Sequence, residues 1–573
     1  MTLKAFRLAS LMLVFSTVSS LAATPAITAQ SLSGNFLAGR AATQAKDSGV
    51  AAQYLEAALR QDPGNPGIVE QLFLMRLNNG NVAAAEQLAP DVLKINSQHR
   101  MARLVTGLKA FREKKYFDAR VDFAEAAYTP LGELTSTMLT AWTYAGEGSL
   151  NAALKELDKL DSNENFANFK SFQSALIADY LSSPVRAEVA YKKAYGQGAA
   201  SLRVIQAYGN YLERNGKFDE AAKIYDDFLA KTDNYPLVAK ARAELALKKK
   251  PEAFVSSPER GVGETLSSLA AIMNDDQSID IALLYSRLAL EHGANQVVTQ
   301  IMLGDVLSSM KRYEDSITAY GAVPADSPLR SAADLEIAGN LQQLDRNGEA
   351  ETLLKAMVAK DPKNFEAHVA LGSLNRFSEK FDKAVEEYDA ALKLLPSVGK
   401  NQWRIIYDRA ICHERLNQWD KAEADFRKAL ELQPDEPNVL NYLGYSLIDK
   451  RLKLDEAIAM VKKAVELKPN EGFFVDSLGW AYFQTNDFDQ ALPHLERAVD
   501  LKAGDPIIAE HLGDAYWRVG RKLEAHFQWQ HAKDNKPDAK DLVRIEGKLK
   551  DGLPDLPPLV KPADAGAPKA TNG

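Results

Sequence analysis

Residues 478–532 decide the fold, and they read LGWAYFQTNDFDQALPHLERAVDLKAGDPIIAEHLGDAYWRVGRKLEAHFQWQHA. Within this stretch Leu478-Gly479 is followed by Ala491, and 34 residues later Leu512-Gly513 is followed by Ala525. A repeat of this length is typical of units built from two antiparallel helices. One such unit cannot bury its own apolar face, so the pattern predicts units that stack on one another.

Counting outward at this period places 14 units, with interruptions that shift the later ones. The units begin at residues 32, 66, 100, 134, 168, 202, 263, 297, 331, 365, 403, 437, 472 and 506. The eighth residue of each unit is Gly or Ala, with Phe73 as the exception. The twentieth residue is Ala in 13 units and Ser316 in the other: Ala51, Ala85, Ala119, Ala153, Ala187, Ala221, Ala282, Ala350, Ala384, Ala422, Ala457, Ala491 and Ala525. Small residues let two helices cross closely while larger apolar residues fill the gaps around them.

This pattern resembles the tetratricopeptide-repeat (TPR) family, and the resemblance covers residues 32 to about 537. It implies an all-α TPR superhelical solenoid of about 14 helix-turn-helix repeats, whose first helices line a concave groove. It also implies protein or peptide partners and no catalytic role. The family pattern is weakest in the units that begin at residues 32, 66 and 168.

Breaks in the period indicate the domain organisation. We expect a first solenoid over residues 32–250, a Pro- and Gly-containing linker over 251–262, and a second solenoid over 263–537. A capping helix is predicted over 538–552, because a terminal repeat needs its exposed face covered. Residues 553–573 contain five prolines and are predicted to be a disordered tail.

The N-terminus has the layout of a secretory signal peptide over residues 1–23. Lys4 and Arg7 precede an apolar run over 8–18, and small residues follow at Ala22-Ala23. The prediction is an exported protein in the periplasm with no transmembrane helix after signal cleavage. The alternative is an uncleaved signal that anchors the chain, because sequence does not decide cleavage.

Composition and motifs argue against several functional classes. A net charge of −8 argues against a nucleic-acid partner, which needs concentrated Lys and Arg. Cys412 is the single cysteine, and the pattern around it favours a buried apolar role. Phosphate-binding loops and nucleophile elbows are missing from the sequence. The spacing of His494, His511, His526 and His531 does not fix a metal geometry. We therefore predict no enzyme, no cofactor, no metal and no small-molecule substrate.

Two candidate partner-binding surfaces follow from the positions that face the groove in TPR proteins. The C-terminal set combines aromatic rings with amides, which suit an extended peptide, and Asp476, Glu510 and Asp514 add acidity. It comprises Arg404, Tyr407, Asn438, Asn441, Tyr445, Phe473, Trp480, Phe483 and Trp517. The N-terminal set is apolar and suits an amphipathic helix or helix packing. It comprises Leu108, Phe111, Met138, Trp142 and Phe172, with Met101, Leu104, Phe169 and Leu176 beside them. In the alternative interpretation both sets pack against neighbouring repeats.

Residues 442–532 also resemble the C-terminal repeats of proteobacterial envelope TPR proteins, one of which is an adaptor for a carboxyl-terminal processing protease. The resemblance implies a periplasmic scaffold or adaptor. A cysteine for lipid attachment is missing near residue 23, where the lipoprotein would have one. The alternative is a structural, self-associating component of an envelope or export assembly, for which a homo-oligomer is the natural form.

Overall fold

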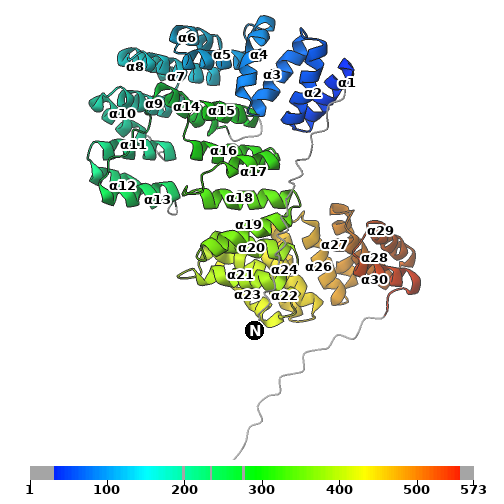
Figure 1. The fold of residues 1–573 in the computed structure, drawn as a ribbon. Helices are drawn as coiled ribbons and strands as arrows, with labels where there is room; N and C mark the ends of the chain where they lie inside the picture. The colour runs from blue at the N-terminus through cyan, green and yellow to red at the C-terminus, as the bar shows by residue number, and fades with distance from the viewer. Residues whose placement is uncertain (1–30, 197–200, 233–234, 274–277, 555–573) are drawn as a thin grey trace, which may run out of the picture. The chain divides into compact units, whose positions relative to one another are not determined.

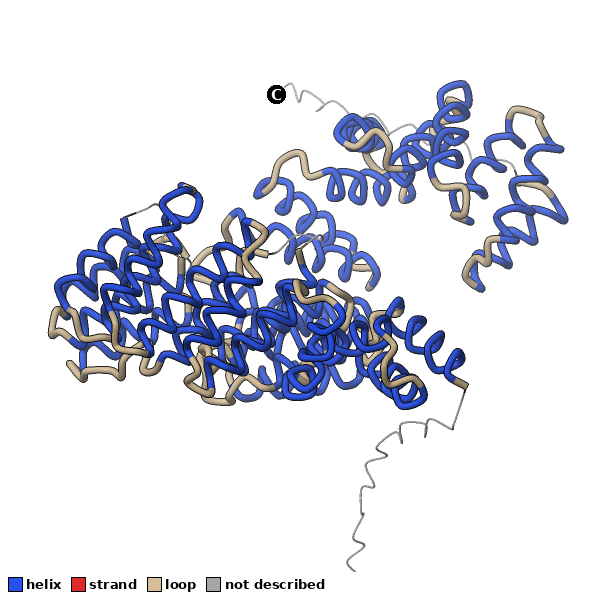
Figure 2. Tube along the Cα trace, turned by 90° about the horizontal axis from the view of Figure 1, so that it is seen from above, coloured by secondary structure: helices blue, strands red, loops and turns tan. Residues whose placement is uncertain are grey.

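The structure is a computed structural model that describes residues 31–196, 201–232, 235–273 and 278–554. Every regular element in these ranges is a helix, and Figure 2 draws no strand among them. This confirms the predicted all-α solenoid. The predicted signal peptide lies outside the described residues, as does the predicted tail beyond Pro554.

The chain divides into two compact units, residues 1–350 (unit 1) and 351–573 (unit 2). The boundary falls inside helix α19 rather than at the predicted linker. The physical reason is that α14 packs against α7 and α9, and α15 packs against α3 and α4 (Figure 1). The repeats that follow residue 258 therefore share the hydrophobic core of the N-terminal repeats.

The helices that lie wholly within unit 1 form eight pairs and two single helices, α13 and α18, and α19 spans the unit boundary. The bounds are α1 (Leu32–Gln44), α2 (Ser48–Gln61), α3 (Pro66–Asn78), α4 (Val82–Ile95), α5 (Arg100–Arg112), α6 (Tyr116–Glu125), α7 (Pro130–Gly146), α8 (Leu150–Leu157), α9 (Ala167–Tyr180), α10 (Pro184–Gly196), α11 (Leu202–Arg214), α12 (Phe218–Leu229), α13 (Pro236–Glu244), α14 (Pro258–Ala270), α15 (Ile279–Glu291), α16 (Gln296–Ser309), α17 (Tyr313–Gly321), α18 (Arg330–Gln343) and α19 (Asn347–Lys360).

Unit 2 continues with five pairs and a final single helix. Their bounds are α20 (Phe365–Phe377), α21 (Phe381–Lys393), α22 (Trp403–Arg415), α23 (Trp419–Leu432), α24 (Pro437–Asp449), α25 (Leu454–Leu467), α26 (Gly472–Gln484), α27 (Phe488–Leu501), α28 (Pro506–Arg518), α29 (Lys522–Asp534) and α30 (Ala539–Asp551).

The helix pairs are in step with the predicted repeat. Twelve of the 13 Ala residues at the twentieth position lie in the second helix of a pair, and Ala350 lies in α19; all 13 are fully buried, with 0% of their surface exposed. Ser316, at the same position, is equally buried and donates its hydroxyl hydrogen bond to the carbonyl of Gly304. The small residue at this position therefore marks the crossing of the two helices in every pair.

The glycine at the eighth position is required by the large residue at the twenty-fourth. A Cβ added to Gly209 would lie 2.3 Å from the ring of Tyr225, and one added to Gly513 would lie 2.5 Å from Trp529. The exception Phe73 has a compensating partner, since the twenty-fourth residue of its unit is Ala89. Both are fully buried, so the large and small partners have exchanged places.

Helix α14 begins earlier than predicted and shortens the expected linker. Ser257 caps the helix by accepting a hydrogen bond from the backbone N–H of Arg260, and Pro258 occupies the first turn. Serine followed by proline is a helix-start signal, because proline has no N–H to leave unpaired there. The glycines at 261 and 263, which suggested a linker, lie inside the helix.

The exchange of Phe73 and Ala89 gives a testable double-mutant cycle. Phe73→Ala alone should lower the free energy of unfolding by about 3–5 kcal/mol by leaving a cavity. Ala89→Phe alone should lower it through overpacking, by about 1–3 kcal/mol. The double variant restores one large and one small residue, so urea unfolding should show a favourable coupling of about 1 kcal/mol or more. Simple additivity would contradict the proposed contact.

Candidate functional site

The apolar N-terminal set is interior in the structure. Leu108, Phe111, Met138, Trp142 and Phe172 are at most 5% exposed, and all five belong to the core of unit 1. The same core contains Val262 and Leu266 of α14 and Leu288 of α15. The expectation of an open N-terminal groove, the face formed by α5, α7 and α9, is therefore corrected: the chain's own helices cover it.

Helix α14 is fitted to this groove through small and polar residues. A Cβ added to Gly261 would lie 2.4 Å from the Trp142 ring, so a larger residue would push α14 away. The indole N–H of Trp142 donates to the side-chain oxygen of Gln173 at 2.8 Å, and the Thr265 hydroxyl donates to the same oxygen at 3.2 Å. The glycine, the hydroxyl and the shared acceptor fix the position of α14 along α7 and α9.

Ion pairs hold the returning helices at points far apart in the sequence. Glu264 of α14 is nearly buried and accepts from Arg203 Nε at 3.1 and 3.0 Å. Arg112 of α5 lies between Glu86, at 2.8 Å, and Glu291 of α15, at 3.4 Å. Such pairs add geometric specificity, and breaking one leaves a buried charge uncompensated.

His292 lies in the same closed region and has no hydrogen-bond partner at either ring nitrogen within the described chain. It is 2% exposed. Burial, together with the charge of Arg112, lowers the pKa of His292 to about 3. The imidazole is therefore neutral in the folded protein across the physiological range.

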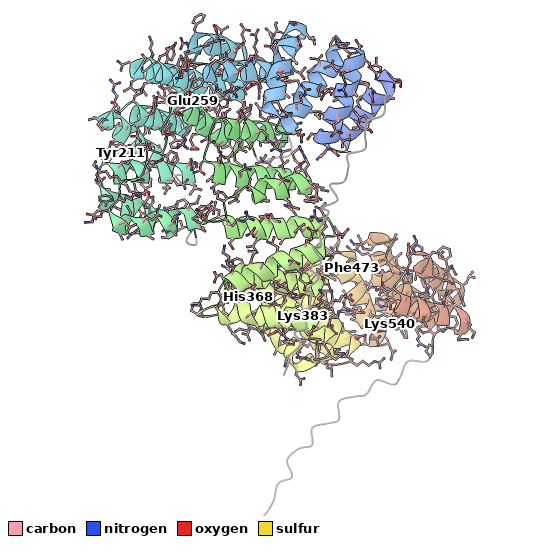
Figure 3. All side chains as sticks on the ribbon, in the orientation of Figure 1. Tyr211, Glu259, His368, Lys383, Phe473 and Lys540 are labelled. Carbon is pink, nitrogen blue, oxygen red and sulfur yellow. The ribbon has the colours of Figure 1, made fainter. Side chains whose placement is uncertain are left out.

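The C-terminal set is spread over different degrees of exposure. Arg404 and Asn438 are exposed, and so is Phe473 on α26, which Figure 3 labels. The half-buried members are Tyr407, Asn441, Tyr445, Trp480 and Trp517. Phe483 was expected to face the groove, but it is 1% exposed and belongs to the core around α27 and α28. The expectation for this residue is therefore corrected. The half-buried residues come from α22, α24, α26 and α28.

Trp480 lies at the centre of an aromatic and charged stack. Its ring is stacked on Phe483 at 4.8 Å and on His511 at 3.9 Å between centroids. His511 Nδ1 lies 3.0 Å from both carboxylate oxygens of Asp476. Burial opposes charging of the ring, but the charge of Asp476 and its hydrogen bond raise the pKa of His511 above its ordinary value. The stack therefore holds Trp480 in one orientation.

The acidic end of the C-terminal groove is covered by α30. Arg544 binds both carboxylate oxygens of Glu510, at 2.6 and 2.5 Å. Lys548 lies 2.6 Å from Glu510 and 2.6 Å from Asp514. Although burial opposes ionisation, these cations hold the pKa of Glu510 below its ordinary value. Glu510 and Asp514 thus bind the chain's own helix and do not form an open acidic surface.

The part of the face that α30 leaves uncovered presents Tyr445, Asn441 and Trp480. The Asn441 side-chain oxygen and the Trp480 N–H are buried and have no hydrogen-bond partner within the described residues. Burial, followed by the charges of Asp476 and Asp449, raises the pKa of Tyr445, which keeps its phenol neutral. This arrangement offers aromatic area with neutral hydrogen-bonding groups, which suits an uncharged peptide backbone.

A polar cavity that the sequence analysis missed lies among α21, α22 and α23. It measures about 510 Å³, and His413, Lys421 and Asp382 are among its lining residues. Arg409 in its wall lies 2.6 Å from Asp389 and 2.7 Å from Asp425. Arg409 is thus held between two carboxylates of the cavity wall. The sequence signal that could have indicated this cavity is the length of the unit that begins at residue 365, which has 38 residues instead of 34.

The other titratable candidates are structural. Among the described residues, no three His, Cys, Asp or Glu side chains are placed to hold a metal ion. His494 stacks on Tyr482 at 5.7 Å, and His526 lies edge-on to Trp517 at 5.8 Å. Burial raises the pKa of the Cys412 thiol to about 12. In the described ranges no helix has the length and apolarity needed to span a membrane.

Comparison with known proteins assigns the repeats. A tetratricopeptide-repeat family model matches residues 403–436, and a second matches residues 335–398 and 477–539. These three segments are tetratricopeptide repeats, and they lie within a chain whose described helices form a solenoid of pairs. The fold is thus one typical of protein–protein interaction scaffolds.

Two curated proteins share short segments with the chain. The human protein O-mannosyl-transferase TMTC1 is 26% identical over 142 residues, 25% of this chain and 16% of that protein. The Arabidopsis thaliana E3 ubiquitin-protein ligase CHIP is 34% identical over 73 residues, 13% of this chain and 25% of that protein. The chain therefore spans a quarter or less of either relative.

Solved structures with similar helix arrangements include the Cut9–Hcn1 hetero-tetramer of the APC/C and yeast Tom70. Cut9–Hcn1 is 14% identical, with 92% of this chain and 97% of that chain covered, and a TM-score of 0.39. Tom70 is 13% identical, with 91% and 95% covered and a TM-score of 0.29. At these identities the likeness concerns the fold only.

The contact between Gly261 and Trp142 can be tested directly. Gly261→Ala should loosen α14, because the new methyl group overlaps the Trp142 ring, and overpacking of this kind costs about 1–3 kcal/mol. Hydrogen exchange measured by mass spectrometry should be faster in α14 and α15. Gly339→Ala is the matched control in unit 1, since nothing lies within 4 Å of its added Cβ. Equal exchange in both variants would contradict the fitted groove.

The neutral His292 predicts a pH dependence of stability. Its pKa is depressed in the folded state, so the unfolded chain binds the proton more readily below its ordinary value of 6.5. The contribution of His292 to the free energy of unfolding is complete above about pH 6.5. It decreases as the pH is lowered, by about 2 kcal/mol at pH 5. The His292→Gln variant should show a smaller loss between pH 7 and pH 5 in hydrogen-exchange protection of α15. If the variant lost as much exchange protection between pH 7 and pH 5 as the unchanged protein, His292 would be excluded as the titrating group.

Proposed function

We propose that unit 2 binds a segment of a partner protein along the first helices of its repeats, at Tyr407, Asn441, Tyr445 and Trp480. The observation behind this proposal is that aromatic rings and one amide side chain, all half-buried, come from the first helices α22, α24 and α26. A bound segment would cover the accessible part of these rings, and a side-chain amide beside them suits an extended backbone. The tetratricopeptide fold supports a scaffold role of this kind.

Within the cell, we propose that the protein is an exported scaffold or adaptor of the periplasm, with an envelope protease as one candidate partner. The support is the signal-like layout of residues 1–23 and the resemblance of residues 442–532 to envelope TPR proteins. The alternative is a self-associating structural component. Its proposed surface, the N-terminal groove, is filled by α14 and α15, which favours the adaptor role.

A crosslinking experiment tests the proposed surface. A photoreactive phenylalanine analogue at Tyr445 should capture specific envelope proteins, whereas the same analogue at exposed Lys421 on α23 should not. Trp480→Ala should reduce recovery of the captured partner at least tenfold, because it removes the Trp480 ring from the proposed binding surface. Trp419→Ala is the matched control, since this half-buried indole lies on α23, a second helix, beneath Lys450.

A loss of partner binding must be distinguished from a loss of folding. Circular dichroism must show that Trp480→Ala keeps the helix content, because Trp480 also packs on Phe483 and His511. Capture of the same proteins from positions 445 and 421 would overturn the proposal, since it would indicate adhesion without a defined face.

A further inference from the structure

Unit 1 contains an apolar cavity where α14 ends. The cavity measures about 460 Å³ and lies among the N-terminal ends of α9, α11 and α16 and the C-terminal end of α14. Its apolar wall is formed by Phe169, Phe172, Leu202, Val204, Ile272 and Val298. Phe169 and Phe172 also belong to the N-terminal set, so the cavity adjoins the groove that α14 covers.

Two of the four polar residues that line the cavity, Arg203 and Ser201, are engaged within the chain. Arg203 donates through Nε to Glu264 and through Nη1 to Gln206, at 2.6 Å. The Ser201 hydroxyl accepts the backbone N–H of Val204 and caps α11. A charged ligand would therefore meet a guanidinium that is already neutralised by Glu264. The chemistry of the wall favours an uncharged apolar ligand.

The size of the cavity exceeds what packing leaves between helices. Protein interiors have few voids larger than a water molecule, whereas sites for small ligands measure about 300–1,000 Å³. A water molecule inside a cavity needs about two to four polar partners, and this wall offers few. Apolar cavities that stay dry are known to bind small apolar molecules. The cavity therefore has the volume and surface of a ligand site.

Access from solvent is provided at one side of the wall. Ile272 is 54% exposed, and Ala271 and Asn168 are also exposed. Both Ala271 and Asn168 belong to the cavity lining. A ligand can therefore enter without displacing α14, which Gly261 and Glu264 hold in the groove.

We propose that this cavity is a binding site for a small uncharged apolar ligand, an alkyl chain or an aryl group. The exposed Asn168 lies at the mouth, where a neutral polar head would remain in water, and the rings of Phe169 and Phe172 receive the apolar part. The site is in unit 1 and is independent of the peptide surface proposed for unit 2.

The test uses N-phenyl-1-naphthylamine, an uncharged apolar fluorophore, titrated into the full chain. We expect saturable binding with one site per chain and a blue shift in emission. Ala271→Trp fills the mouth and Ile272→Asp places a charge there, and each should weaken binding at least tenfold. Ala83→Trp, on an exposed position of α4, is the matched control and should bind as the unchanged protein does.

Each outcome decides the proposal. Displacement of the fluorophore by 1-dodecanol would assign the site to alkyl chains, and retention would assign it to aryl groups; both support the apolar site. Binding that does not saturate would overturn it, as would binding unaffected by both mouth variants. Circular dichroism of the two variants separates a filled mouth from a misfolded chain, and because the mouth residues are exposed we expect both to fold.

Discussion

The close approach of two helices within each repeat is the contact on which the rest of this structure depends. Ala at the twentieth position and Gly or Ala at the eighth remove the side chains that would separate the axes. The large residue at the twenty-fourth position then lies over the gap, as Tyr225 does over Gly209. Phe73 and Ala89 are both fully buried with the large and small positions exchanged, which fits a constraint on the sum of the two volumes.

In both units, a helix of the chain covers part of the face formed by the first helices of the repeats. In unit 1 α14 fits the N-terminal groove through Gly261 and Glu264, and in unit 2 α30 binds Glu510 and Asp514 through Arg544 and Lys548. A solenoid exposes a long apolar or charged face, and covering it removes a cost in solvation. What stays open is then a smaller and more specific surface.

That surface differs in chemistry between the two units. In unit 2 it is aromatic and amide-rich, around Tyr445, Asn441 and Trp480, and Trp480 is oriented by the His511–Asp476 pair. In unit 1 it is a cavity lined by Phe169 and Phe172 beside a neutralised Arg203. Peptide backbones and small apolar molecules are the ligands that these two surfaces would respectively select.

The sequence by itself determined the helical fold, the 34-residue step and the pairing, because Ala384, Ala422 and Ala491 report local crossings within one unit. It also placed Trp480 and Tyr445 on the first helices of their repeats. Only the tertiary structure decided that Trp142 and Phe483 are interior, that α14 starts at Pro258, and that the compact units meet inside α19. The burial of Trp142 depends on the return of α14, which contacts such as Arg203–Glu264 hold across 61 positions of sequence. A repeat pattern describes neighbours along the solenoid and carries no signal for where the chain folds back.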